Sequence, residues 1–219
     1  MFPISDVIPS RSVPFVTVGL IALNILIFIY QLTLPEPALQ LFVARYAVVP
    51  ARFSFPTLFT SQFLHGGIMH VGGNMLYLWI FGDNVEDRLG HLRYLIFYLA
   101  AGAFAAILQT VFNPYSQVPM IGASGAIAGV MGAYFVLYPQ SRVLTVVFLL
   151  IFFDVVEIPA IFFLGIWFVM QLLNGVGSIG ATSNLGGGTA FWAHVGGFVI
   201  GVLVGFGARR RDRRWDRAV

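Results

Sequence analysis

Two residues that lie far apart in the sequence have the chemistry of a nucleophile and its base. Ser124 stands in the stretch Gly-Ala-Ser-Gly at 122–125, and His194 stands in Ala-His-Val-Gly-Gly at 193–197. A serine hydroxyl becomes an effective nucleophile when a neighbouring base takes its proton, and histidine is the side chain that titrates near neutral pH. No aspartate or glutamate lies in the apolar segment around either residue, so the pattern predicts a Ser-His dyad rather than a triad.

A second pair of polar residues has the chemistry to stabilise the negative charge that serine attack creates. His70 and Asn74 are four residues apart, which places them on one face of a helix. Both side chains can donate hydrogen bonds from nitrogen. Together with the backbone N–H of Ser124 they would form an oxyanion site, in which one donor is typically worth about 3–4 kcal/mol of the barrier.

The same residues also have plainer interpretations. Ser124 is consistent with a small-residue packing motif that contains an incidental serine. His70 and Asn74 are consistent with hydrogen bonds that hold helices together, each worth about 0.6 kcal/mol on average. A metal site is disfavoured, because His65, His70 and Asn74 include no carboxylate and no third strong ligand. We therefore expect no metal.

These residues belong to a chain that is too apolar for a soluble protein. Of its 219 residues, 58% are hydrophobic and 10% are charged, whereas soluble domains average roughly 45–50% and about 25%. The absence of cysteine excludes thiol chemistry and cysteine-ligated metals. The net charge is +3 and the sequence contains no large basic domain, so nucleic acid is not an expected partner. A polytopic membrane protein of one domain remains.

Six apolar segments are candidates to cross a bilayer, which requires about 20 helical residues. The predicted spans are 13–34, 66–82, 92–112, 121–138, 160–174 and 190–208. The predicted fold class is therefore an all-α membrane bundle of six transmembrane helices with an interfacial first loop over 35–64.

Three other connections differ in character. Residues 83–91 form a predicted polar connector, and residues 175–189 form a glycine-rich loop. Residues 143–159 form either the start of a kinked helix or an interfacial hairpin, and Asp154 and Glu157 favour the interfacial alternative. The glycine-rich loop and the fifth span are our expected mobile gate.

Two of the spans carry small residues at helical spacing, which would let their backbones approach closely. The two stripes consist of Ser124, Ala128 and Gly132 on the span 121–138, and of His194, Gly197, Gly201 and Gly205 on the span 190–208. Contact between these stripes would bring the histidine to hydrogen-bond distance of the serine.

The arginines indicate how the spans are oriented. Six crossings put both termini on one side, and that side then holds ten of the twelve arginines, leaving Arg45 and Arg52 on the other. Basic residues accumulate in cytoplasmic loops. We therefore expect a short cytoplasmic N-terminus over 1–12, a membrane domain over 13–208 and a basic cytoplasmic tail over 209–219 that also touches anionic lipid. The short loops favour a prokaryotic inner membrane.

The motifs together resemble those of the rhomboid family of intramembrane serine proteases. The matching stretches are HVGGN at 70–74, GDNVEDRLG at 82–90, GASG at 122–125 and AHVGGFVIG at 193–201. They occur in the family's order over nearly the whole chain, and the second is similar to the family's GxxxExxxG element. The resemblance implies a six-helix core with a water-filled cavity that opens away from the cytoplasm, and cleavage of transmembrane segments without a cofactor.

Carried over to this sequence, the resemblance implies roles for seven residues. They are Ser124 as nucleophile, His194 as general base, His70, Asn74 and Gly122 at the oxyanion site, and Glu86 and Arg88 as structural residues at the end of the second span.

Two positions depart from the family's pattern. Phe-Pro-Thr-Leu at 55–58 stands where many members have Trp-Arg, so the first loop must be anchored differently. Ala128 stands where some members place a tyrosine against the catalytic histidine, so other contacts must orient His194.

Two further functions compete with that of a protease. A rhomboid-like pseudoprotease would bind membrane clients without cleaving them, and it would be expected to lack the serine or the histidine. A transporter with His70 and His194 as a proton relay would be expected to show inverted repeats or intramembrane carboxylates, which the sequence lacks. We therefore expect a serine endopeptidase whose partners are transmembrane protein substrates and lipid.

Overall fold

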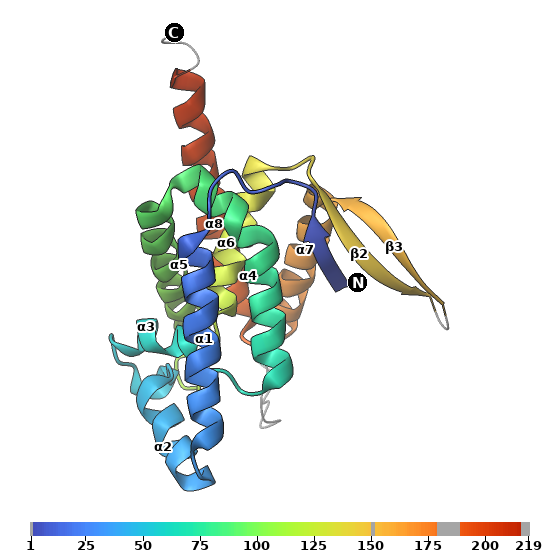
Figure 1. The fold of residues 1–219 in the computed structure, drawn as a ribbon. Helices are drawn as coiled ribbons and strands as arrows, with labels where there is room; N and C mark the ends of the chain where they lie inside the picture. Colours follow the sequence, from blue (N-terminus) through green and yellow to red (C-terminus); the bar gives the residue numbers. More distant parts are fainter. Residues whose placement is uncertain (1, 150–151, 179–188, 216–219) are drawn as a thin grey trace.

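A computed structural model of the chain describes residues 2–149, 152–178 and 189–215. Six helices form its bundle: α1 (Phe15–Thr33), α4 (Ile68–Leu89), α5 (His91–Phe112), α6 (Ser124–Leu137), α7 (Ala160–Ser178) and α8 (Phe191–Trp215) (Figure 1). Between α1 and α4 the chain forms four short elements: α2 (Glu36–Tyr46), η1 (Pro50–Arg52), α3 (Thr57–Thr60) and η2 (Ser61–Phe63).

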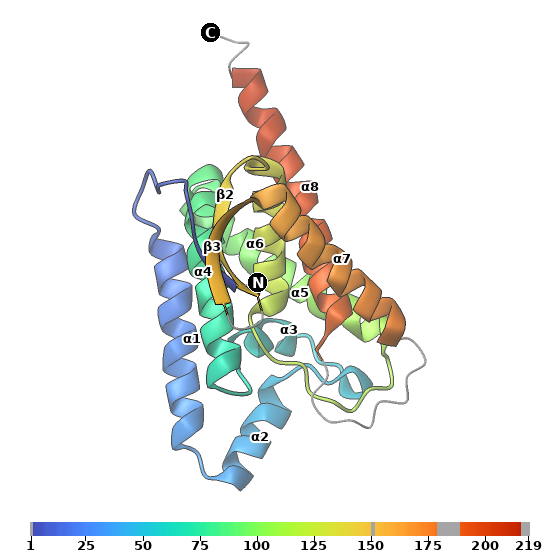
Figure 2. The same ribbon diagram turned by 90° about the vertical axis from the view of Figure 1, so that its right-hand side faces the viewer.

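The centre of the bundle is α6, which packs against α4, α5, α7 and α8 (Figure 2). Almost all of its side chains are buried. Four helices are long and apolar enough to cross a membrane, namely α1, α5, α7 and the first part of α8, and α6 is a shorter apolar helix. This arrangement confirms the predicted helical membrane bundle.

The fourth and eighth helices are longer than the sequence predicted. The prediction of a polar connector over 83–91 was wrong. Residues 83–89 form the last turns of α4, and only Gly90, with φ of +79°, separates α4 from α5. Their polar side chains bond to the segment that precedes α1 and to the first residues of α1 itself, so the helix continues. Similarly, α8 runs through Trp215 and makes the first part of the predicted tail helical.

The expected gate is only partly described. Residues 175–178 of the predicted glycine-rich loop belong to the end of α7. Residues 179–188 of that loop, and residues 216–219 of the predicted tail, lie outside the described residues.

One end of the bundle carries a three-stranded antiparallel sheet that the sequence did not predict. Its strands are β1 (Phe2–Asp6), β2 (Arg142–Leu149) and β3 (Phe152–Pro159), in the order β1-β2-β3. The hairpin β2–β3 excludes the kinked helix over residues 143–159 and agrees with the hairpin alternative, since β-branched and aromatic residues favour strands. Its place at the membrane interface stays a prediction. The predicted N-terminal segment 1–12 adds β1 to the edge of this hairpin.

The helices α6 and α8 touch through their backbones. A Cβ atom at Gly197 would lie 2.0 Å from the carbonyl oxygen of Gly125, and one at Gly201 would lie 1.9 Å from that of Gly129. The predicted stripe on α8 therefore lies in the contact. On α6, Gly132 of the predicted stripe also lies in the contact, since a Cβ atom there would lie 2.1 Å from the oxygen of Phe198. Gly125 and Gly129 approach α8 as closely, although the predicted stripe did not include them.

The arginines are divided between the two ends of the bundle. Arg88 and Arg93 flank the α4–α5 turn, and Arg209 in α8 donates to the backbone oxygen of Val136 at the end of α6. Arg45 and Arg52 lie in α2 and η1, at the opposite end (Figure 1). This division agrees with the predicted spans, which place Arg45 and Arg52 on one side of the membrane and Arg88, Arg93 and Arg209 on the other.

Candidate active site

The loop before α6 is held in place by the segment between α1 and α4. Val48 and Met120 exchange two backbone hydrogen bonds of 3.2 and 2.7 Å, and the N–H of Gly122 donates to the oxygen of Ser61 over 2.9 Å. Val48 and Leu58 are buried in a small apolar cluster with residues of α5. Packing and backbone pairing therefore anchor the first loop, in the absence of the Trp-Arg pair.

Ser124 is the first residue of α6, directly after this anchored loop. The first backbone N–H groups of a helix have no acceptor within the helix, and the helix dipole makes this end favourable for negative charge. The Ser124 side chain keeps part of its surface exposed. A hydroxyl and free amide donors are thus presented together.

His194 lies in the first turn of α8 and meets Ser124 side chain to side chain. Its Nε2 lies 2.9 Å from the Oγ of Ser124. The backbone contact at Gly197 and Gly125 lies about one turn further into the bundle, and it sets how closely the two helix ends approach. The structure therefore brings together the two residues that the sequence singled out as nucleophile and base.

The other side of the imidazole is contacted by α7. The Nδ1 of His194 lies 2.9 Å from the Oε1 of Gln171, and the ring of Trp167 lies 5.7 Å from the imidazole, centroid to centroid. Some members of the family that the sequence resembles place a tyrosine against this histidine where Ala128 stands. Here Gln171 and Trp167 contact the imidazole instead. Gln171 was not among the residues that the sequence singled out. The available signal was a polar side chain one turn after Trp167 in a strongly apolar helix.

Gly122 is the point where the turn before α6 meets α4. Its φ of +119° is a conformation that L side chains rarely adopt. A Cβ atom there would lie 2.7 Å from the Nε2 of His70 and 3.5 Å from the Nδ2 of Asn74. Both donors of the predicted oxyanion site therefore flank this turn, and only glycine leaves them room.

The hydrogen bonds of His70 and Asn74 determine which atoms are free to face a ligand. The N–H of Gly66 donates to the Nδ1 of His70 over 3.4 Å, so the proton of the neutral imidazole lies on Nε2, beside Gly122. The amide of Asn74 donates one hydrogen to the Nε2 of His65, 2.9 Å away, and keeps a second. His65 thus orients Asn74 from a buried position.

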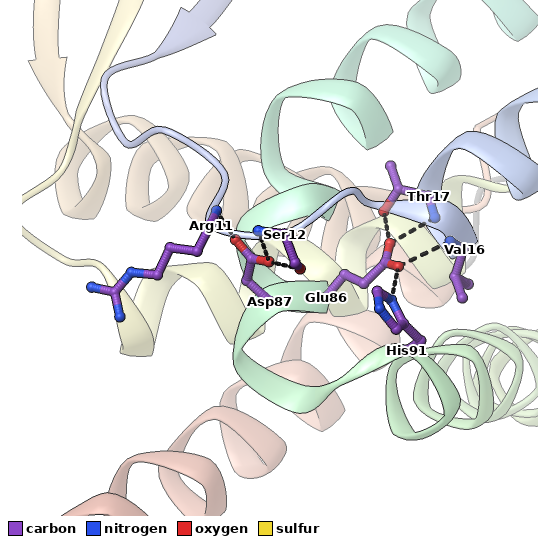
Figure 3. A network of polar contacts seen from close by, with 7 residues as sticks. All are labelled: Arg11, Ser12, Val16, Thr17, Glu86, Asp87 and His91. Atoms are coloured by element: carbon purple, nitrogen blue, oxygen red, sulfur yellow. Dashed lines mark hydrogen bonds and ion pairs between the residues drawn. The ribbon is translucent and has the colours of Figure 1, made fainter.

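The far end of α4 holds the second cluster of predicted residues. The carboxylate of Glu86 is fully buried and accepts from the N–H groups of Val16 and Thr17 at 2.9 and 2.7 Å, and from the Thr17 hydroxyl (Figure 3). It also lies 2.6 Å from the Nδ1 of His91. Glu86 therefore caps the N-terminus of α1, where a negative charge is favoured.

Asp87 extends this network to the segment before α1. Its carboxylate accepts from the backbone N–H groups of Arg11 and Ser12 and from the Ser12 hydroxyl (Figure 3). Arg88 lies exposed in the same turn of α4. The GxxxExxxG-like stretch thus joins the start of α1 to the end of α4.

Comparison with known proteins shows the family of the chain. A family model described as Rhomboid domain matches residues 52–211, which is more than half of the chain. The chain belongs to the rhomboid family. The matched range contains His70, Asn74, Ser124 and His194, so the whole candidate site lies inside the rhomboid domain.

Three curated relatives illustrate the similarity. Rhomboid protein 1, mitochondrial, from Saccharomyces cerevisiae is 27% identical over 195 residues, which cover 86% of this chain and 51% of the yeast protein. Rhomboid protease GluP from Bacillus subtilis is 49% identical over 76 residues, which cover 35% of this chain and 14% of the Bacillus protein. Presenilin-associated rhomboid-like protein, mitochondrial, from Homo sapiens is 32% identical over 138 residues, which cover 61% of this chain and 35% of the human protein. The chain spans about half the length of the yeast relative and less of the others.

Family membership and the apolar helices together make the chain an integral, multi-pass membrane protein. The relatives do not favour a prokaryotic inner membrane, because two of the three are mitochondrial and one is bacterial. That location and the cytoplasmic placement of both termini stay predictions.

Proposed function

We propose that this rhomboid is an intramembrane serine endopeptidase that hydrolyses peptide bonds in or near transmembrane segments of other membrane proteins. The observation that carries the proposal is the 2.9 Å contact between the Oγ of Ser124 and the Nε2 of His194 at the start of α6. The donors of His70 and Asn74 across the turn at Gly122 add to its support. The resemblance to a relative named as a protease points the same way.

The reaction begins with attack of the Ser124 oxygen on the scissile carbonyl carbon. His194 takes the hydroxyl proton on Nε2 as the new C–O bond forms. The carbonyl oxygen becomes negatively charged and accepts hydrogen bonds from the Ser124 amide, from His70 Nε2–H and from Asn74 Nδ2–H. Because these donors are already oriented by Gly66 and His65, they need little reorganisation.

The proton on His194 then moves to the leaving nitrogen, and the C–N bond breaks to leave an acyl-enzyme on Ser124. A water molecule gives a proton to His194 and attacks the acyl carbon, and the returning proton restores the Ser124 hydroxyl as the product acid leaves. Water must reach this point inside the bundle, which agrees with the partly exposed surfaces of Ser124, His70 and His194.

The proposal extends to the domain layout. Residues 13–208 would carry the catalytic bundle, and the arginine-rich end, with residues 1–12 and 209–219, would face the cytoplasm. A prokaryotic inner membrane is the proposed location. The substrate bond would then meet Ser124 towards the opposite face.

The alternative is a rhomboid-like pseudoprotease that binds membrane clients without cleaving them. A fluorophosphonate probe separates the two, because it reacts only with an activated serine. In detergent, we expect the purified protein to be labelled, and labelling and cleavage of a reconstituted transmembrane substrate to be lost in Ser124→Ala and in His194→Ala. Ser54→Ala, at an exposed serine of the first loop, is the matched control. Client binding with no labelling of the wild type would favour the pseudoprotease.

A further inference from the structure

One contact of the candidate site has no place in a two-residue mechanism. The Oε1 of Gln171 lies 2.9 Å from the Nδ1 of His194, on the side of the imidazole opposite Ser124. Gln171 lies one turn beyond Trp167, so a single face of α7 supplies both the amide and the aromatic ring that contact His194.

This contact determines where the imidazole carries its proton. A carbonyl oxygen can only accept, so Nδ1 is the protonated nitrogen of the neutral ring. Nε2 then presents its lone pair to the hydroxyl of Ser124, as a general base requires. In the other tautomer, the lone pair of Nδ1 would face the oxygen of Gln171, and Nε2–H would point at Ser124 and take no proton from it.

The surroundings of Gln171 favour a role in orienting His194 over that of a general link between helices. The helix α7 is long and apolar enough on average to cross a membrane, and a polar side chain in such a helix needs a partner. Among the described residues, the Gln171 side chain has one hydrogen-bond partner, and that partner is His194. By contrast, Gln109 of α5 binds the backbone N–H of Ala193 at 3.2 Å and has no hydrogen bond to the imidazole.

We propose that Gln171 is the positioning residue of His194, so that the site works as an amide-ended triad of Ser124, His194 and Gln171. This rests on the proposed function, because positioning matters only if His194 is the base. The amide would hold the ring and its tautomer while the proton moves through Nε2, and it would stabilise the imidazolium through the same hydrogen bond.

Two variants of Gln171 and one of Gln109 test the proposal on the full chain in detergent. Gln171→Met keeps the length and removes the acceptor. We expect its kcat for a transmembrane peptide to fall at least tenfold with KM changed less than twofold. Gln171→Glu keeps an acceptor at the same place, so activity above about pH 8 should recover. Its carboxylate stabilises the protonated ring, so the acid limb of its pH–rate profile should move to higher pH.

Gln109→Met is the matched control for a glutamine that only joins helices. It should lower thermal stability without a shift in the pH–rate profile. If Gln171→Met does not fold, Gln171→Glu alone carries the test through its pH profile. The proposal is overturned if Gln171→Met cleaves at the wild-type rate, or if Gln171→Glu is as slow as Gln171→Met and its profile does not move. A wild type without Ser124-dependent labelling would instead overturn the proposed function.

Discussion

The two ends of α4 use buried polar groups in opposite ways. At one end, the carboxylate of Glu86 is fully buried, and two backbone N–H groups, a hydroxyl and the imidazole of His91 occupy its oxygens. At the other end, His70 and Asn74 are neutral, each is oriented by one partner, and each keeps one N–H directed at the turn before Ser124.

The difference separates a structural cluster from a site that can do chemistry. A carboxylate whose lone pairs are all used stabilises the fold and has nothing left for a substrate. Donors that are held in place and still have an unbonded N–H can stabilise a negative charge that appears only during a reaction. Substitutions at the two ends should therefore affect different measurements.

Gly122→Ala should have the largest effect, and on activity. The added Cβ meets the Nε2 of His70 at 2.7 Å, and φ of +119° is strained for alanine. We expect cleavage to slow by about 100-fold or more, the loss typical of one oxyanion donor. Substrate cleavage in detergent is the measurement. Gly67→Ala, where a Cβ atom meets nothing within 4 Å, is the control and should remain active. Equal activity in the two variants would remove Gly122 from the site.

Glu86→Ala should act on stability instead. It leaves the buried N–H of Thr17 and the part-buried N–H of Val16 without an acceptor, and a buried unsatisfied group costs roughly 1–3 kcal/mol. Thermal unfolding in detergent should show a clear drop, while fluorophosphonate labelling at low temperature continues. Glu36→Ala, at an exposed carboxylate of α2, should change stability by less than about 0.5 kcal/mol. A variant that stays stable but loses labelling would break the division between the two ends.

The smallest expected effect is a pH-dependent weakening of the attachment of β1. Burial raises the pKa of Asp6 to about 6, and the nearby charge of Asp83 acts in the same direction. Asp6 accepts hydrogen bonds from the Tyr134 hydroxyl and from Asn84. Since the folded state binds the proton more tightly, the attachment of β1 should weaken as pH rises from about 4 to 6.

Hydrogen exchange of residues 2–6 measures this opening. Exchange rates, corrected for their intrinsic pH dependence, should rise across that interval in the wild type and stay level in Asp6→Asn. Asp154→Asn, at an exposed carboxylate of β3, should behave like the wild type. A pH-dependent opening that persists in Asp6→Asn would assign the effect to another group.

Much of the architecture could be read from local patterns. Apolar length predicted α1 and α5 within two residues of their observed bounds. The glycine spacing on α8 predicted its contact with α6. These features depend on neighbours within a helix, and hydropathy and spacing report such neighbours directly.

The predictions failed where polar residues find partners far along the chain. Residues 83–89 read as a connector because nothing local offers partners for their acidic side chains, yet residues 10–17 supply those partners and the helix continues. The strand β1 was missed for a related reason, since it pairs with β2 more than a hundred residues later.

By itself, the sequence determined that the chain is a membrane bundle and which serine, histidines and asparagine are placed to do chemistry, because composition and helical spacing are local properties. Only the tertiary structure decided which atoms meet. The approach of α6 and α8 brings Ser124 within 2.9 Å of His194, and the packing of α7 brings Gln171 to the opposite face of the ring. Which helix face meets which neighbour depends on packing among all the helices, and no spacing within one segment reports that.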